Sequence, residues 1–318
     1  MKDYKNSEAH NVKHKKKRFW IILAIVISLL LLGFGAYAYS IYNNIDRTYK
    51  PLKREKSEKR ENKVSIKRND PIAVLLLGVD KRKGDKGRSD TMIVATINPK
   101  DKTMKLLSIP RDTRVEIVGK GIQDKINHSF AFGGVEMSIH TVEKFLDIPI
   151  DYYAQINMEG LAEIIDQVGG IQIDSPIAFS EGGKSFSKGI NNLNGKEALL
   201  YVRMRKQDPK GDFGRQERQR IVIQELLSKL ISVDSVPRLN GIVRSLGDNI
   251  STNLKVSEAM DMREGYGPAR SNSETLNLEG SGQKINGIYY FVPKQSSVDS
   301  IITVLKNHLE LNNQTSAE

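Results

Sequence analysis

The stretch RMRKQDPKGDFGRQERQR, residues 203–220, holds seven basic and three acidic side chains and is the most chemically suggestive part of the sequence. Most of its cations are arginines, whose planar guanidiniums bind phosphate oxygens in bidentate pairs, which lysine cannot do. A proline and two glycines near its middle predict a turn between two sets of arginines. These residue types indicate a binding site for a phosphate-bearing anion.

The two sets are expected on different elements. In YVRMR, Arg203 and Arg205 alternate with apolar residues, so as a strand both guanidiniums would face one side. The run RQERQRIVIQELLSKL has helical composition, and residues at i, i+3 and i+4 share a face of its first turns: Arg215, Arg218 and Gln219. Cations at the positive end of a helix dipole cost local stability unless an anion lies between them. We therefore expect an anion at this helix end.

Two aspartates could hold a metal ion beside these arginines. Asp80 closes an apolar run and Asp90 opens the next, with the basic loop KRKGDKGRS between them. A hairpin-like connection would bring both carboxylates to one rim of a sheet, and Mg²⁺ prefers a few carboxylate oxygens with water and substrate phosphate. The alternative is two turn aspartates in a solvated basic loop, and the spacing alone does not choose between these interpretations.

Buried strands are expected to position these groups. The continuous apolar run at 71–80 is typical of a strand that is covered on both faces, and the apolar-rich runs at 91–98 and 103–109 predict two more strands. Arg111 follows the third run, where Pro110 ends the strand and turns the chain toward the same rim. Ligands in open α/β sheets usually bind at such strand ends. Arg111 therefore joins the candidate anion site.

The remaining pattern alternates helices with strands. Amphipathic spacing predicts three helices, through Val135–Leu146, Leu161–Val168 and Val298–Leu309, and GIQIDS and GIYYFV are expected strands. Elements interleaved in this way predict a single α/β domain with helices on both faces of a sheet.

Composition and charge exclude several classes of function. The chain has 49 basic and 38 acidic residues, and the first 68 positions hold 17 of the basic and 6 of the acidic ones. The rest of the chain therefore carries 32 residues of each sign and has no net charge. A nucleic-acid-binding domain normally shows a basic excess, so no nucleic-acid partner is expected. The absence of cysteine excludes thiolate metal sites and disulfides. P-loop, GxSxG and HExxH motifs are missing, and His128 and His140 are interpreted as a polar loop residue and a helix residue rather than as catalytic groups.

The N-terminal quarter of the chain predicts a membrane anchor. Residues 19–41 are 23 uncharged, mostly apolar positions, long enough to cross a bilayer, and basic residues 1–18 before them predict a cytoplasmic tail by the positive-inside bias. We expect an uncleaved single-pass anchor in the cell membrane with the large domain outside. Residues 42–70 are expected to form a solvated stalk that packs no core, residues 71–311 the domain, and residues 312–318 a frayed tail.

The motifs LLLGVD, RSDTMIV, SIPRDT, KINHSFAFGG, VGGIQID and LNGKEALLYVRMRKQDPKGDFGRQERQ, in this order after an anchor, resemble the LytR-CpsA-Psr family of Gram-positive cell-wall enzymes. The resemblance implies a three-layer α/β/α sandwich with a mixed central sheet and an apolar tunnel for a polyprenyl chain. By resemblance, Asp80 and Asp90 are Mg²⁺ ligands and Asp212 orients or deprotonates the acceptor hydroxyl. The implied diphosphate ligands are Arg88, Arg111, Arg203, Arg205, Arg215, Arg218 and Gln219, and the two strand-predicted arginines, Arg203 and Arg205, are also expected to take part in catalysis.

The activity implied is transfer of an anionic glycopolymer from undecaprenyl diphosphate to the C6 hydroxyl of N-acetylmuramic acid in peptidoglycan, which forms a phosphodiester. Wall teichoic acid is the expected polymer, although capsular and teichuronic-type polymers use the same lipid carrier. Two other hypotheses stay open. The same metal and arginines could activate water in a polyprenyl-diphosphate hydrolase, or the chain could be a regulator or polymer-binding membrane protein without enzymatic activity.

Overall fold

The computed structural model describes residues 56–80, 87–231 and 249–311. The chain divides into two compact units, Met1–Lys50 and Pro51–Glu318, and every described residue belongs to the second. The expected cytoplasmic tail, the expected anchor at 19–41 and the expected C-terminal tail at 312–318 lie outside the described residues. Within the described ranges, no helix has both the length and the apolar character needed to span a bilayer.

The described domain is built around a six-stranded mixed sheet with the order β11-β6-β1-β2-β3-β12. Neighbouring strands along the chain, β1 with β2 and β2 with β3, run antiparallel, and so does β11 with β6. The pairs β1 with β6 and β3 with β12 are parallel. The strands are β1 (Ile72–Asp80), β2 (Arg88–Asn98), β3 (Thr103–Ile109), β6 (Tyr152–Asn157), β11 (Ile250–Thr252) and β12 (Ser273–Leu276). The three apolar runs expected as buried strands are thus confirmed as the centre of the sheet.

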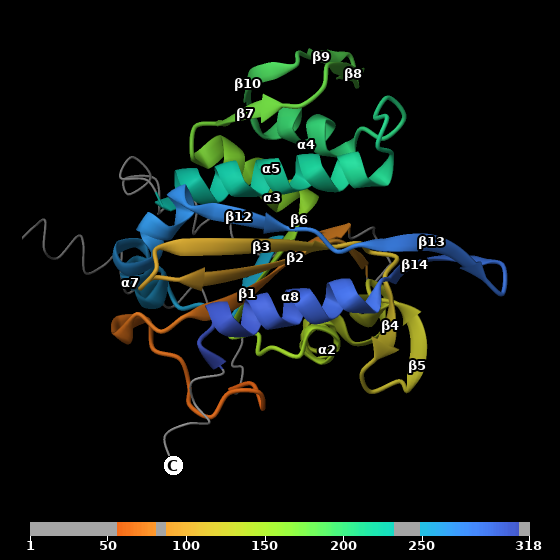
Figure 1. Cartoon of the computed structure of the whole chain (residues 1–318). Coiled ribbons are helices and arrows are strands. Elements are labelled where there is room, and N and C mark those ends of the chain that lie inside the picture. Colours follow the sequence, from red (N-terminus) through yellow and green to blue (C-terminus); the bar gives the residue numbers. More distant parts are fainter. Residues whose placement is uncertain (1–55, 81–86, 232–248, 312–318) are drawn as a thin grey trace, which may run out of the picture. The chain divides into compact units, whose positions relative to one another are not determined.

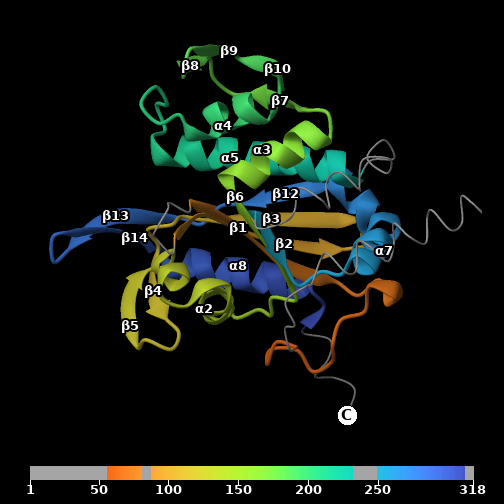
Figure 2. The ribbon, with the colours of Figure 1, turned by 180° about the vertical axis from the view of Figure 1, so that it is seen from behind.

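Helices cover both faces of this sheet, as Figures 1 and 2 show. One face carries α2 (His128–Leu146) and α8 (Gln295–His308), and the other carries α3 (Met158–Gln167) and α5 (Asp212–Ile231), with α4 (Gly195–Arg203) packed beyond them. Three further elements lie at the end of the sheet where β1 and β3 begin. They are helix α7 (Val256–Tyr266) and the 3-10 segments η1 (Ile66–Arg68) and η4 (Gly267–Ser271). The predicted mixed α/β fold with helices on both faces is therefore confirmed, and so are the three amphipathic helices.

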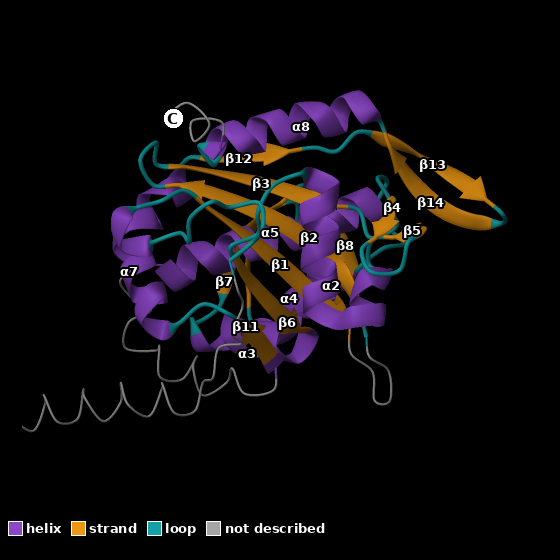
Figure 3. Cartoon of the chain, turned by 90° about the horizontal axis from the view of Figure 1, so that it is seen from below, coloured by secondary structure: helices purple, strands orange, loops and turns teal. Residues whose placement is uncertain are grey.

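Four small pairs of antiparallel strands lie outside the central sheet in the described part of the chain. The pairs are β4 (Arg114–Ile117) with β5 (Ile122–Lys125), β7 (Ile171–Ser175) with β10 (Gly189–Leu193), β8 (Phe179–Glu181) with β9 (Lys184–Phe186), and β13 (Gly280–Ile285) with β14 (Ile288–Pro293). The expected strands GIQIDS and GIYYFV therefore exist but belong to these small pairs. Figure 3 shows β4, β5 and the β13–β14 hairpin at one end of the central sheet, where Thr113 also bridges to Phe291.

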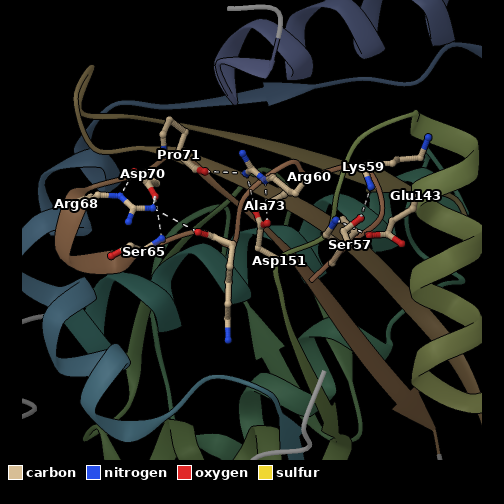
Figure 4. A network of polar contacts seen from close by, with 12 residues as sticks. Ser57, Lys59, Arg60, Ser65, Arg68, Asp70, Pro71, Ala73, Glu143 and Asp151 are labelled. Carbon is tan, nitrogen blue, oxygen red and sulfur yellow. Dashed lines mark hydrogen bonds and ion pairs between the residues drawn. The ribbon is translucent and has the colours of Figure 1, made fainter. Parts of the chain in front are cut away.

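Residues 56–70 are fastened to the opposite end of the sheet, where β1 and β6 begin. The Arg60 guanidinium donates to both Asp151 carboxylate oxygens, at 3.0 and 2.8 Å, and to the Pro71 carbonyl at 2.8 Å. Asp151 also accepts the Ala73 backbone N–H at 2.8 Å. Figure 4 shows this network, whose two charged side chains are only 5% and 4% exposed.

The expectation that residues 42–70 pack no core is therefore wrong for residues 56–70. Ile66 is buried in a cluster with Ile72, Tyr152 and Tyr266, and the Tyr266 hydroxyl donates to the Asp70 carbonyl at 2.6 Å. The segment contributes the buried side chains of Ile66 and Arg60. Because the segment is mainly polar, its overall composition did not predict that these two residues would be buried. The domain consequently begins before Pro71.

The expected YVRMR strand is also wrong, because these residues end helix α4. Asn194 caps the helix by accepting the Glu197 N–H while the Glu197 carboxylate accepts the Asn194 N–H, a capping box that starts a helix at Gly195. Buried Ala198, Tyr201 and Val202 follow helical spacing. The local alternation of apolar and basic residues was too short to outweigh this helical period.

Candidate active site

The register of β1 and β2 brings the two candidate metal aspartates to one end of the sheet. Asp80 pairs with Arg88, and the register shifts so that Val79 pairs with Ser89 and Gly78 with Thr91. Asp90 is left without a partner on β1, which makes it the extra residue of a β-bulge. Bulges bend a strand and redirect a side chain, and they occur often next to active sites. The Asp80 side chain and residues 81–86 lie outside the described residues.

Asp90 meets Arg111 at this strand end. Arg111 Nη1 donates to Asp90 Oδ1 at 2.9 Å, and Arg111 Nε lies 3.7 Å from Asp112 Oδ2. The Asp90 and Arg111 side chains are 23% and 25% exposed, so both remain accessible to a ligand. The predicted convergence of Asp90 and Arg111 is confirmed, because β2 starts where antiparallel β3 ends.

The start of α5 borders the same sheet end. Thr91 Oγ1 donates to Gln219 Oε1 at 2.9 Å, which fixes the second turn of α5 over the start of β2. Arg215 is buried at 3% exposure and Gln219 at 7%. Asp212 is the first residue of the helix, and its side chain lies outside the described residues. The next residue, Phe213, is 54% exposed and contacts the ring of Phe291 on β14 edge-on at 6.0 Å.

Arg218 occupies a different environment from the one expected. Its side chain is wholly buried, Nε donates to the Tyr201 carbonyl at 3.1 Å, and Nη2 donates to the Met204 carbonyl. Nη1 pairs with Asp208, and the guanidinium lies 5.4 Å from the centre of the Phe179 ring. The sequence predicted a diphosphate ligand, whereas the structure gives Arg218 protein partners that hold the α4–α5 connection in place. Helical spacing placed it on the correct face but could not reveal Asp208 beneath it.

The arginine that ends α4 and the one two residues beyond it are both exposed. Arg203 and Arg205 are exposed on either side of Met204, which is fully buried and has extended backbone angles. Because Met204 between them is buried, Arg203 and Arg205 are both exposed, as the strand interpretation predicted, although the strand itself is not present. Arg88, at the start of β2, is exposed as well.

A second polar cluster, which sequence reasoning missed, extends from Arg111 toward α2. It contains Asp112, Asp124, Lys125, His128 and Tyr290. Lys125 Nζ donates to Asp112 Oδ1 at 2.6 Å, His128 Nδ1 lies 2.8 Å from Asp124 Oδ2, and the Tyr290 hydroxyl lies 3.4 Å from Asp124 Oδ1. The available signal was the spacing of Asp124 and His128 at i and i+4 around a helix start.

No group of three or more possible metal ligands occurs among the described side chains. The donors near the strand end still suit a hard cation, because Asp90 is a half-buried carboxylate on a bulge and the backbone register places Asp80 beside it. Such a cation would lie next to Arg111, which contacts Asp90, and near the exposed Arg88 at the start of β2.

Comparisons with known proteins identify the family of the chain. The model of the LytR_cpsA_psr family matches residues 36–307. A polyisoprenyl-teichoic acid--peptidoglycan teichoic acid transferase TagU of Bacillus subtilis is 46% identical over 300 residues, covering 94% of this chain and 98% of that protein.

Solved structures are similar over most of the domain. An Enterococcus faecalis protein described as a transcriptional regulator matches with a TM-score of 0.71 and 39% identity, over 77% of this chain and 90% of its own. A structure described as TagT bound to LIIa-WTA matches with a TM-score of 0.70 and 32% identity, over 82% of this chain and 99% of its own.

Proposed function

Because the chain belongs to the LytR-CpsA-Psr family and is a transferase, we propose that it transfers wall teichoic acid from undecaprenyl diphosphate to peptidoglycan. The acceptor is the C6 hydroxyl of N-acetylmuramic acid, and the product is a phosphodiester. The name of the TagU relative supports the polymer and the acceptor, and the TagT complex supports a glycopolymer ligand for this fold.

The observation that carries the proposal is the gathering of arginines and carboxylates at one end of the sheet. Arg111 and Asp90 meet there, Arg88 is exposed on the neighbouring strand end, and the first turns of α5 are fixed above them through Gln219. Guanidiniums and a helix N-terminus both favour a diphosphate, and a bound cation would offset its remaining charge. Arg203 and Arg205 are available as additional ligands from the end of α4.

The apolar interior supports a lipid chain on the α5 side of the sheet. On β1, the side chains that face α2 and α8 are at most 1% exposed, from Ala73 to Val79. The side chains that face α5, Val74 and Leu76, are only half-buried, as are Ile97 and Ile223 in the same cluster. Incompletely covered apolar surface inside a domain fits an apolar guest, and we propose that the polyprenyl chain lies there.

In this reaction the protein would mainly orient the acceptor hydroxyl and the diphosphate and neutralise the negative charge of the phosphates. The acceptor oxygen forms a bond to the phosphorus next to the sugar, and the bond from that phosphorus to the bridging oxygen breaks. Polyprenyl phosphate then leaves with the electron pair. Arg111, Arg203 and Arg205 would bind the non-bridging oxygens, and Asp212 would orient the acceptor hydroxyl. Asp80 and Asp90 would hold Mg²⁺, which supplies Lewis-acid stabilisation of the developing charge when bound.

We also propose that the domain works outside the cell, anchored by residues 19–41. The positive-inside bias and the location of peptidoglycan both support this topology. Digestion of intact cells with an external protease tests it, because an external domain is degraded. A protected domain would instead favour the regulator hypothesis.

The activity is tested with a lipid-diphosphate oligosaccharide, Mg²⁺ and peptidoglycan. A transferase leaves the sugar phosphate joined to peptidoglycan, whereas a hydrolase releases it into solution. Arg203→Ala should reduce transfer strongly and leave the melting temperature unchanged, since Arg203 is exposed. Arg270→Ala is the matched control, because Arg270 is also exposed but lies in η4, beside the start of β3. Equal transfer by both variants would remove Arg203 from the site.

A further inference from the structure

The ends of two helices approach the reactive end of the sheet from opposite faces. α5 begins at Asp212 on one face, and α2 begins at His128 on the other (Figures 1 and 2). The start of α2 is tied to the site through the backbone, because the Asn127 N–H donates to the Arg111 carbonyl at 3.3 Å. His128 is therefore the titratable side chain that follows directly on this contact.

His128 and Asp124 form an oriented pair. Nδ1 of His128 lies 2.8 Å from Asp124 Oδ2, and the side chains are 27% and 18% exposed. With Nδ1–H donated to the carboxylate, Nε2 is left as the basic nitrogen, and it has no hydrogen-bond partner among the described residues. The Phe132 ring lies steeply inclined to the imidazole in a T-shaped contact, with 6.1 Å between ring centres.

Asp124 is held as a carboxylate by its surroundings. Burial raises its pKa, but hydrogen bonds from His128 and from the Lys125 backbone lower it by more, so the net pKa lies below the ordinary value. An ionised carboxylate fixes the tautomer of the imidazole and stabilises the imidazolium once a proton has arrived. Among the described residues, the other charged or titratable groups around the pair include Lys125 on β5 with its partner Asp112, Arg114 on β4, Tyr290 on β14 and Lys120 before β5.

We propose that His128, oriented by Asp124, is the general base that takes the proton from the acceptor hydroxyl. This inference rests on the proposed transferase function. Nε2 accepts the hydroxyl proton while the acceptor oxygen bonds to phosphorus and polyprenyl phosphate leaves with the electrons of the broken P–O bond. The imidazolium then returns its proton to water.

The direction of attack favours His128 over Asp212 for this role. In phosphoryl transfer the attacking and leaving oxygens lie roughly in line on opposite sides of phosphorus. If the departing lipid lies under α5, the acceptor approaches from the face that carries α2. An imidazole also changes charge between about pH 5 and 8, so it is a better base near neutral pH than a carboxylate of ordinary acidity. Asp212 keeps the orienting role.

The decisive experiment compares pH profiles of transfer for the wild type, His128→Gln and His140→Gln. His140 is a matched control on the same helix, 54% exposed and with Nδ1 3.4 Å from a Glu143 carboxylate oxygen. His128→Gln should lower the rate at pH 7.5 about a hundredfold, within the range of a general base, and remove the fall in rate toward pH 5.5. His140→Gln should retain both the rate and the profile.

Two further measurements separate catalysis from structure. Imidazole added to His128→Ala should restore part of the rate, which it could not do for a residue that only supports the fold. Asp124→Asn should lower kcat with little change in KM for peptidoglycan. A wild type that transfers nothing would refute the proposed function, whereas a wild type that transfers and a His128→Gln profile of unchanged shape and height would refute the role of His128.

Discussion

Arg60→Ala should destabilise the domain far more than its position outside the predicted domain boundary implies. Arg60 and Asp151 are 5% and 4% exposed, and the guanidinium makes two hydrogen bonds to the carboxylate and one to the Pro71 carbonyl. Truncation to Ala leaves the Asp151 charge buried with the Ala73 N–H as its remaining partner in this network. Uncompensated buried charge is among the costliest of point defects.

The expected cost can be estimated from comparable buried pairs. Removing one partner of a buried salt bridge typically costs about 3–5 kcal/mol. For a domain of this size each kcal/mol lowers the melting temperature by about 2–4 °C, so Arg60→Ala should lower it by roughly 6–20 °C. Arg68→Ala is the control in the same segment, because Arg68 is 62% exposed and its pair with Asp70 should contribute at most about 1 kcal/mol.

The assay is urea unfolding and thermal melting of the two variants beside the wild type. The slope of the urea transition should be unchanged, since the same surface is exposed on unfolding. Asp151→Asn should lose a similar amount to Arg60→Ala, because it breaks the same contact from the other side. Equal, small losses for Arg60→Ala and Arg68→Ala would show that residues 56–70 are not part of the folded domain.

Three other outcomes follow from the structure. Asp208→Asn leaves the buried Arg218 charge without its counterion, so the free energy of unfolding measured with urea should fall by about 3–5 kcal/mol. Transfer activity should fall as well. An unchanged free energy of unfolding would show that the pair is not formed. Burial and nearby Lys105 lower the pKa of His308 to about 4, so the folded state binds fewer protons than the unfolded state between pH 4 and 6.5. The contribution of neutral His308 to stability should therefore be fully present above pH 6.5 and decrease toward pH 4. The melting temperature of His308→Gln, measured against pH, should lack this decrease. Chelation with EDTA should abolish transfer and added Mg²⁺ should restore it, whereas full activity in EDTA would contradict a role for the metal.

The centre of the fold could be predicted because its strands have an unambiguous pattern. The runs that became β1, β2 and β3 are rich in consecutive apolar residues, which is typical of strands covered on both faces. The amphipathic spacing of α2, α3 and α8 was equally clear. What the pattern could not specify was partnership, so the strands β7 and β14 were expected but their separation from the central sheet was not.

The parts of the site that were not predicted depend on the direction in which individual side chains turn, which spacing along the chain does not specify. Helical spacing correctly grouped Arg215, Arg218 and Gln219, yet Arg218 turns inward because Asp208 and two carbonyls receive its guanidinium. The pairing of Asp90 with Arg111 was predictable, since strand ends of known direction fixed it. His128 was interpreted as a polar loop residue because a sequence shows spacing to Asp124 but not the orientation of the imidazole.

The two ends of the central sheet carry separate tasks, and this separation makes the inferences independent. The Arg60–Asp151 pair closes the end where β1 and β6 begin, while Asp90, Arg111 and His128 surround the end where β1 stops. The nine residues of β1 place these ends about 30 Å apart at roughly 3.3 Å per residue. Sites at that distance with no shared partners have nearly additive effects. Arg60→Ala should therefore lower stability without altering the shape of the pH profile, and His128→Gln should alter the profile without lowering stability, so that a variant combining both changes would show the two effects side by side.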